Sequence, residues 1–241
     1  MESRKRLIAI VAVAGAMLGA AAFGWGGGWL SRPDSIAFEN PHRPGSAAFV
    51  AFAEYRTEMQ ANPAFVARMD GAADSEEAMR RGAVLTQSGV RRLSDGMLVE
   101  RLELMLRLMQ VGDDAQCAAL AQGAPIDGDV QAFAAIMFAL LDRADADVAQ
   151  RWYAFTRDAT LAALEERPIP AIGDGYREQL GEVIVNGLTA EDLDILLAMS
   201  EQRLIGLSDG ARCAVGRKVL ALILAQSEPE RSQYARLMAE P

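Results

Sequence analysis

Two hydrophobic patterns divide the chain. Residues 7–30 form a run of 24 residues without a charged side chain, whereas apolar residues beyond position 46 recur mostly three and four positions apart. A helix of that length would extend about 36 Å, enough to cross a hydrocarbon core of about 30 Å. Spacing of three and four is typical of amphipathic helices. We therefore expect one transmembrane helix followed by an all-α domain.

The residues flanking the apolar run predict its orientation. Arg4, Lys5 and Arg6 precede it, and basic residues on the short leading side favour a cytoplasmic N-terminus. Trp25 and Trp29 near its other end suit the far membrane interface. The sequence thus predicts a cytoplasmic leader over residues 1–6 and a single-pass signal-anchor over residues 7–30. A proline-rich linker over residues 31–45 and a helical domain over residues 46–241, in the periplasm or its equivalent, complete the organisation.

The same segment also fits a secretory signal peptide. A basic leader, an apolar region and small residues at positions 20–22 provide a cleavage site between Ala22 and Phe23. The apolar region is longer than the usual 7 to 15 residues, which favours the inner-membrane anchor. Both interpretations place the helical domain on the extracytoplasmic side.

Small residues recur every fourth position along the apolar run. Such spacing allows two transmembrane helices to approach closely, so a homodimer could form through this seam. The alternative is an alanine- and glycine-rich segment in which the spacing arises by chance. The seam residues are Ala12, Ala16, Ala20, Gly24 and Gly28.

Beyond the linker, the pattern predicts about 8 to 11 helices and no strand. The uncharged stretch 130–141 is too short to cross a bilayer, so we expect it to be a central buried helix. Capping residues mark several of the other helix starts. The expected helices occupy residues 46–62, 74–90, 95–110, 113–123, 130–141, 145–167, 176–186, 189–204 and 208–226, with a final polar helix at the C-terminus.

The charge of the exported part argues against nucleic acid as a partner. Residues 1–32 hold four Lys or Arg and one Asp or Glu, which leaves 20 basic and 32 acidic residues and a net charge of −12 beyond them. So acidic a surface disfavours phosphate backbones unless a basic patch overrides it, and the sequence contains no such patch.

The chain has two cysteines, Cys117 and Cys213, each in an apolar helical context. In an oxidising compartment an even pair favours a disulfide, which would close a loop of nearly one hundred residues. Two buried free thiols acting as small hydrophobic side chains are the alternative. The predicted compartment favours the disulfide.

No catalytic, metal or cofactor site is expected. The single histidine, His42, lies between Pro41 and Pro44 in the linker, and nucleophilic triads need a histidine held rigidly against the nucleophile. Histidine-based zinc sites need further ligands that the chain lacks. Aspartates gather at positions 142, 145 and 147 and at 127 and 129, but both groups precede expected helices, where aspartate caps free amides.

One long irregular stretch remains inside the domain, and loops on rigid scaffolds often carry binding function. This candidate binding loop contains Pro168, Ile169, Pro170, Ile172 and Asp174. We predict a non-enzymatic envelope protein that binds other envelope proteins, as a scaffold, accessory subunit or inhibitor of the immunity type. The alternative is a glycan-cleaving cell-wall enzyme using Glu/Asp chemistry, for which Glu165 and Glu166 near this loop would be candidates.

Overall fold

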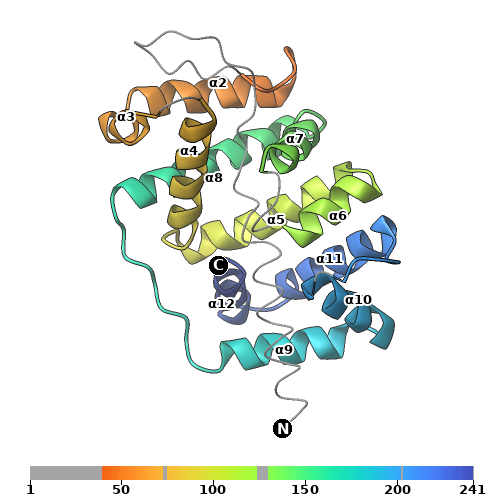
Figure 1. The fold of residues 1–241 in the computed structure, drawn as a ribbon. Helices are drawn as coiled ribbons and strands as arrows, with labels where there is room; N and C mark the ends of the chain where they lie inside the picture. Colours follow the sequence, from red (N-terminus) through yellow and green to blue (C-terminus); the bar gives the residue numbers. More distant parts are fainter. Residues whose placement is uncertain (1–39, 73–74, 124–129, 202, 241) are drawn as a thin grey trace. The chain divides into compact units, whose positions relative to one another are not determined.

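The computed structural model describes residues 40–72, 75–123, 130–201 and 203–240 (Figure 1). The expected leader, membrane segment and first part of the linker therefore lie outside the described residues, as do Asp127 and Asp129. Within the described part, no helix combines the length and the apolar character that a membrane crossing needs. The features predicted for the undescribed N-terminus are Arg4, Lys5, Arg6, Trp25, Trp29, the seam from Ala12 to Gly28 and the cleavage site after Ala22.

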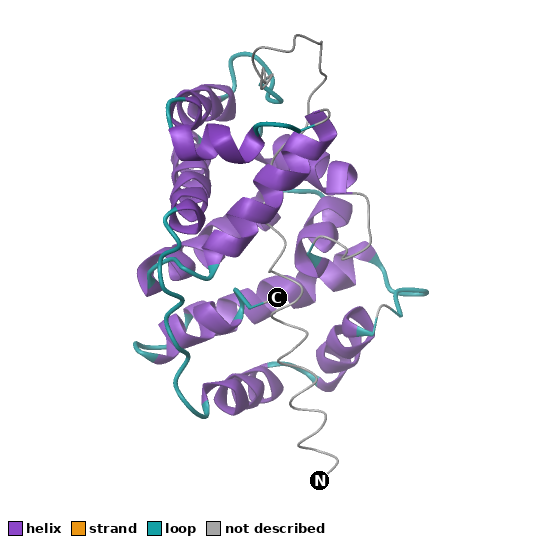
Figure 2. Ribbon diagram, turned by 60° about the vertical axis from the view of Figure 1, so that its left-hand side comes forward, coloured by secondary structure: helices purple, strands orange, loops and turns teal. Residues whose placement is uncertain are grey.

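The described residues form eleven helices and no strand, which confirms the all-α prediction (Figure 2). The helices are α2 (Ala47–Gln60), α3 (Pro63–Met69), α4 (Ser75–Val90), α5 (Asp95–Val111), α6 (Asp114–Gln122), α7 (Val130–Leu141), α8 (Ala146–Leu164), α9 (Tyr176–Gly187), α10 (Ala190–Ser200), α11 (Asp209–Leu224) and α12 (Glu230–Leu237).

Capping side chains set several helix starts where the sequence predicts them. The Asp113 carboxylate accepts a bond from the Gln116 backbone N–H at 2.8 Å, and Thr189 forms the same kind of capping box with Asp192. Asp145 accepts from the Val148 N–H at 2.9 Å at the start of α8. Each bond satisfies a backbone donor that the first helical turn leaves without a partner.

Three elements have features that were not predicted from the sequence. Helix α2 ends before Asn62 and Pro63 as predicted, but Pro63 also begins the short helix α3, because proline is tolerated at the first helical position and Asn62 caps it. Helix α7 is not buried all round, since Ala132 and Ala135 are exposed. Helix α12 is polar in sequence, as predicted, but it buries Tyr234, Leu237 and neighbouring residues.

The described helices fall into two compact units. Unit 1 contains residues 94–123 and 170–240, with helices α5, α6 and α9–α12. Unit 2 contains residues 40–93 and 130–169, with helices α2–α4, α7 and α8. Both units are discontinuous in sequence, so each fold depends on contacts between distant segments.

In unit 2, helix α8 packs against both α2 and α4. At the α4–α8 crossing the two backbones touch: a Cβ added to Gly89 would lie 1.7 Å from the Ala159 carbonyl oxygen. The buried hydroxyls of Thr86 and Thr160 share a hydrogen bond of 2.8 Å in the same interface. Glycine at position 89 is therefore what permits the close crossing.

In unit 1, helix α11 packs against α5, α6, α9 and α10. A disulfide joins Cys117 on α6 to Cys213 on α11, with their Cα atoms 5.1 Å apart, which confirms the predicted pair. Both cysteines are fully buried. Gly216 lies one turn along α11, where an added Cβ would meet the Ala121 methyl group at 2.5 Å.

Candidate functional site

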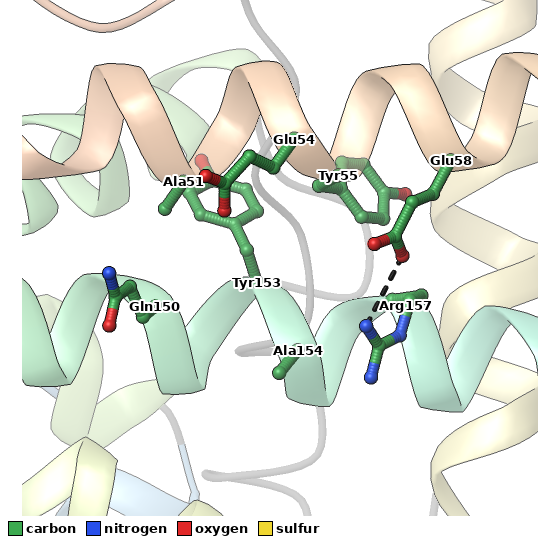
Figure 3. A pocket seen from close by; sticks show the side chains of 8 residues that line it. All are labelled: Ala51, Glu54, Tyr55, Glu58, Gln150, Tyr153, Ala154 and Arg157. Atoms are coloured by element: carbon green, nitrogen blue, oxygen red, sulfur yellow. Dashed lines mark hydrogen bonds and ion pairs between the residues drawn. The ribbon is translucent and has the colours of Figure 1, made fainter.

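A surface hollow of about 220 Å³ lies between α2 and α8 of unit 2 (Figure 3). Helix α2 contributes one wall and helix α8 the other, because their facing positions at this point include alanines that leave space between the helices. The lining side chains are Ala51, Glu54, Tyr55, Glu58, Gln150, Tyr153, Ala154 and Arg157. We refer to this feature as the α2–α8 hollow.

Charged groups line the exposed rim of the α2–α8 hollow. The Arg157 guanidinium reaches across from α8 to Glu58 of α2 at 3.2 Å (Figure 3). It also binds Asp158 at 2.9 Å. The hydrogen bond to Asp158, and then the bond to Glu58, raise the pKa of Arg157 above its ordinary value. Glu54 is exposed, and no cation of the described residues forms an ion pair with it.

Tyr153 connects the floor of the hollow to a buried chain of polar side chains. Its hydroxyl is hydrogen bonded to Nε2 of His42, and Nδ1 of His42 lies 3.1 Å from the Asp142 carboxylate. The His42 ring is only 3% exposed and packs edge-on against Phe52 and Phe138. We call this Tyr153–His42–Asp142 arrangement the relay.

The relay overturns the expectation that His42 lies on a tether. The ring is buried in unit 2, and the residues around it are fixed by further bonds to Asp142. The Arg43 backbone N–H donates to that carboxylate at 3.1 Å and the Ser46 hydroxyl donates at 2.7 Å. The Asn40 amide donates to the Phe49 carbonyl at 2.8 Å. Residues 40–46, the entry segment, are therefore part of the folded unit.

Burial and neighbouring charges determine which groups of the relay carry a proton. Burial lowers the pKa of His42, while the charge of Asp142 opposes that shift in part, so the imidazole is neutral near pH 7. Burial raises the pKa of Tyr153 well above its ordinary value, and the nearby Tyr55 and Asp142 add to the effect. Tyr153 thus keeps its proton and donates to Nε2, while the Nδ1–H of His42 donates to Asp142.

The relay differs from a Ser–His–Asp hydrolytic triad in the residue that contacts Nε2 of the histidine. In a triad the nucleophile contacts the histidine nitrogen opposite the carboxylate. Here the Tyr153 hydroxyl takes that nitrogen, and the nearby serine hydroxyl, Ser46, donates to Asp142 instead. Both nitrogen atoms of the buried His42 ring have a partner, so the relay fixes the position of the Tyr153 hydroxyl and links the entry segment to Asp142.

The α2–α8 hollow also lacks the carboxylate arrangement of a glycan-cleaving site. Such enzymes need two carboxyl groups on opposite sides of the scissile bond. Glu54 and Glu58 lie one turn apart on the same helix, and α8 presents Gln150 and Arg157 opposite them. Among the described residues, no group of three or more His, Cys, Asp or Glu side chains is arranged to hold a metal ion.

The other residues singled out from the sequence lie away from the hollow's lining. The candidate binding loop has no helical structure; Ile169 is 45% exposed, Ile172 is half-buried, and Pro168, Pro170 and Asp174 are exposed. Glu165 and Glu166 are exposed at the end of α8, where Glu165 pairs with Arg167 at 2.7 Å. Of the aspartates considered, Asp145 caps α8 as predicted, whereas Asp142 binds His42.

Sequence reasoning missed the relay and the hollow. His42 is 100 residues from Asp142 and 111 from Tyr153, and its proline neighbours are typical of a linker. Only three features of the sequence pointed to the relay: a single histidine, a tyrosine on an apolar helix face and an aspartate directly after an apolar helix.

Comparisons of the chain with protein-family models, with curated proteins and with solved structures find no match.

Proposed function

We propose that the chain is a membrane-anchored cell-envelope protein whose helical part binds another envelope protein. It would act as a scaffold, an accessory subunit or an inhibitor, without catalysis of its own. The observation that carries the binding function is the α2–α8 hollow, a surface depression with a charged rim and a floor held in place by the relay. A fixed concave surface with exposed charges suits recognition of a partner.

Two further features support the proposed location. The buried Cys117–Cys213 disulfide fits an oxidising compartment outside the cytoplasm. The basic leader followed by the 24-residue uncharged run fits export with the N-terminus retained inside. The mass of the intact chain tests the anchor, because a species retaining residues 1–22 is anchored and one beginning at Phe23 has been cleaved.

Site-directed photocrosslinking in the protein's own cells tests the binding function. The full-length chain would carry p-benzoylphenylalanine in place of Gln150, at the rim of the hollow, and in place of Val84 in a control. Val84 is 63% exposed on α4 of the same unit. We expect one reproducible adduct at position 150, with its partner identified by mass spectrometry, and no such adduct at position 84. No adduct at position 150, or the same adducts at both positions, would contradict the proposal.

A further inference from the structure

The size of the α2–α8 hollow limits what it can bind. Its volume of about 220 Å³ is below the roughly 300 to 1,000 Å³ of sites that enclose a small-molecule ligand. It opens at the surface between two helices, with exposed Glu54 and Glu58 at the rim. A hollow of this size suits one long side chain that projects from the surface of another protein.

The charges around the hollow favour a cation. Three carboxylates, those of Glu54 and Glu58 in the lining and of Asp158 beside Arg157, stand against the single guanidinium of Arg157, which leaves a net charge of −2. Arg157 is offset by two of these acids, whereas Glu54 has no ion-pair partner among the described residues. Glu54 is therefore the group whose pairing with an incoming cation costs no existing contact.

The floor of the hollow consists of alanine methyl groups and tyrosine rings and has a fixed shape. Ala51 of α2 and Ala154 of α8 leave room between the helices (Figure 3). The rings of Tyr55 and Tyr153 lie 5.6 Å apart between centroids, and the bond to His42 fixes the Tyr153 hydroxyl. Such a floor suits the methylene groups of a long basic side chain, whose charged end remains at the wetter rim.

We propose that the α2–α8 hollow receives an arginine side chain of the partner protein. The guanidinium would form an ion pair with Glu54. Its remaining N–H groups would donate hydrogen bonds to Glu58 and to the side-chain oxygen of Gln150. A planar group with five donors matches two carboxylates and an amide better than the compact ammonium of lysine does. This inference rests on the proposed function, since it specifies the chemistry of the partner at the same surface.

A titration with a defined peptide tests the arginine inference. The full-length chain in detergent, labelled with ¹³C at its alanine methyl groups, would be titrated with N-acetyl-Gly-Arg-Gly-amide. The matched probe contains citrulline, which keeps the shape of arginine and removes its charge. We expect saturable shifts of the Ala51 and Ala154 methyl signals with the arginine peptide and binding weaker by about fivefold or more with citrulline.

Substitutions assign the effect to the hollow. Glu54→Gln should weaken binding of the arginine peptide by about fivefold or more, because it removes the unpaired carboxylate. Glu182→Gln, an equal change of charge at an exposed position of α9 in unit 1, should leave binding unchanged. Glu54 is exposed, so its substitution leaves the fold intact, and unchanged methyl spectra of the free variant would verify this. Equal binding of both peptides, no saturable shift, or no effect of Glu54→Gln would overturn the inference.

The crosslinking experiment separates failure of this inference from failure of the proposed function. If the adduct at position 150 persists unchanged in Glu54→Gln, the chain binds a partner at the hollow by other contacts, and the arginine inference alone fails. If no adduct forms in any variant, the proposed function fails at this surface and the inference fails with it. An adduct reduced by about fivefold or more in Glu54→Gln and unchanged in Glu182→Gln supports both.

Discussion

The two units differ in what fixes their principal helix crossings. In unit 1 the α6–α11 crossing contains a covalent bond between Cys117 and Cys213 in addition to the close contact of Gly216 with Ala121. Unit 2 contains neither of the two cysteines of the chain. Its α4–α8 crossing depends on the close approach of Gly89 to Ala159, and its entry segment depends on hydrogen bonds to Asp142.

This difference predicts how each unit responds to its surroundings. A disulfide stabilises mainly by restricting the unfolded chain, so unit 1 should be sensitive to reductant. A close backbone crossing and a buried polar relay stabilise through contacts in the folded state, so unit 2 should be sensitive to added volume and to protonation. Hydrogen exchange followed by mass spectrometry can resolve the units, because their helices give separate peptides.

The largest effect is expected from removal of the disulfide. The bonded cysteines are 96 residues apart, and the chain-entropy model assigns a loop of that length about 4 to 5 kcal/mol. A double Cys117→Ala, Cys213→Ala variant should therefore lose about that much unfolding free energy in unit 1. Exchange should increase in α6 and α11. An equal increase in α4 and α8 would contradict the assignment of the bond's effect to unit 1.

The next effect is expected at the glycine crossing of unit 2. Gly89→Ala would place a methyl group 1.7 Å from a backbone carbonyl oxygen, so α4 and α8 must separate, at a cost of about 3 kcal/mol. Denaturant unfolding and faster exchange in α4 and α8 measure the loss. Gly96→Ala on α5 is the matched control: its Cβ meets open space, so it should be neutral or stabilise by up to about 1 kcal/mol. Similar losses for both variants would contradict the steric explanation.

A smaller effect is expected when the relay is cut. His42→Ala leaves the buried Tyr153 hydroxyl without its acceptor and opens space beside Phe52 and Phe138, at a cost of about 2 to 3 kcal/mol. Exchange should rise in the entry segment and in α8. Tyr153→Phe keeps the ring and removes the hydroxyl, so it should cost less, about 1 to 2 kcal/mol. An exposed His42 ring would instead make both changes neutral.

Local sequence patterns could predict the helices because caps act within one turn. Asp113, Asp145 and Thr189 each mark a helix start with a side chain three residues from the amide it satisfies. The disulfide was predictable because the chain offers a single cysteine pair. The role of Gly89 could not be predicted, because the need for a glycine inside a helix is evident only once the backbone of another helix is seen to approach it. Likewise, His42 has proline neighbours, and only the tertiary fold brings Asp142 and Tyr153 to it.

The smallest effect, and the most specific to unit 2, is expected from pH. His42 is the single histidine of the chain, and burial lowers its pKa below the ordinary 6.5, against the opposing charge of Asp142. A histidine that binds its proton more weakly when folded contributes its full stability above pH 6.5. That contribution decreases as the pH falls below 6.5 towards the lower pKa of the folded state, because the unfolded chain then binds the proton first.

Unfolding measured by denaturant at intervals from pH 8 to pH 5 tests this sign. The wild-type chain should lose stability over that range more steeply than a His42→Gln variant, which has no imidazole to titrate. Carboxylates that titrate in the same range do so in both proteins, so the difference between the two curves isolates His42. The loss should appear in the exchange of unit 2 peptides and leave α6 and α11 of unit 1 unaffected. If the stability curves of the two proteins were parallel, the pKa of His42 would not be lowered in the folded chain. The protonation states assigned to the relay would then be contradicted.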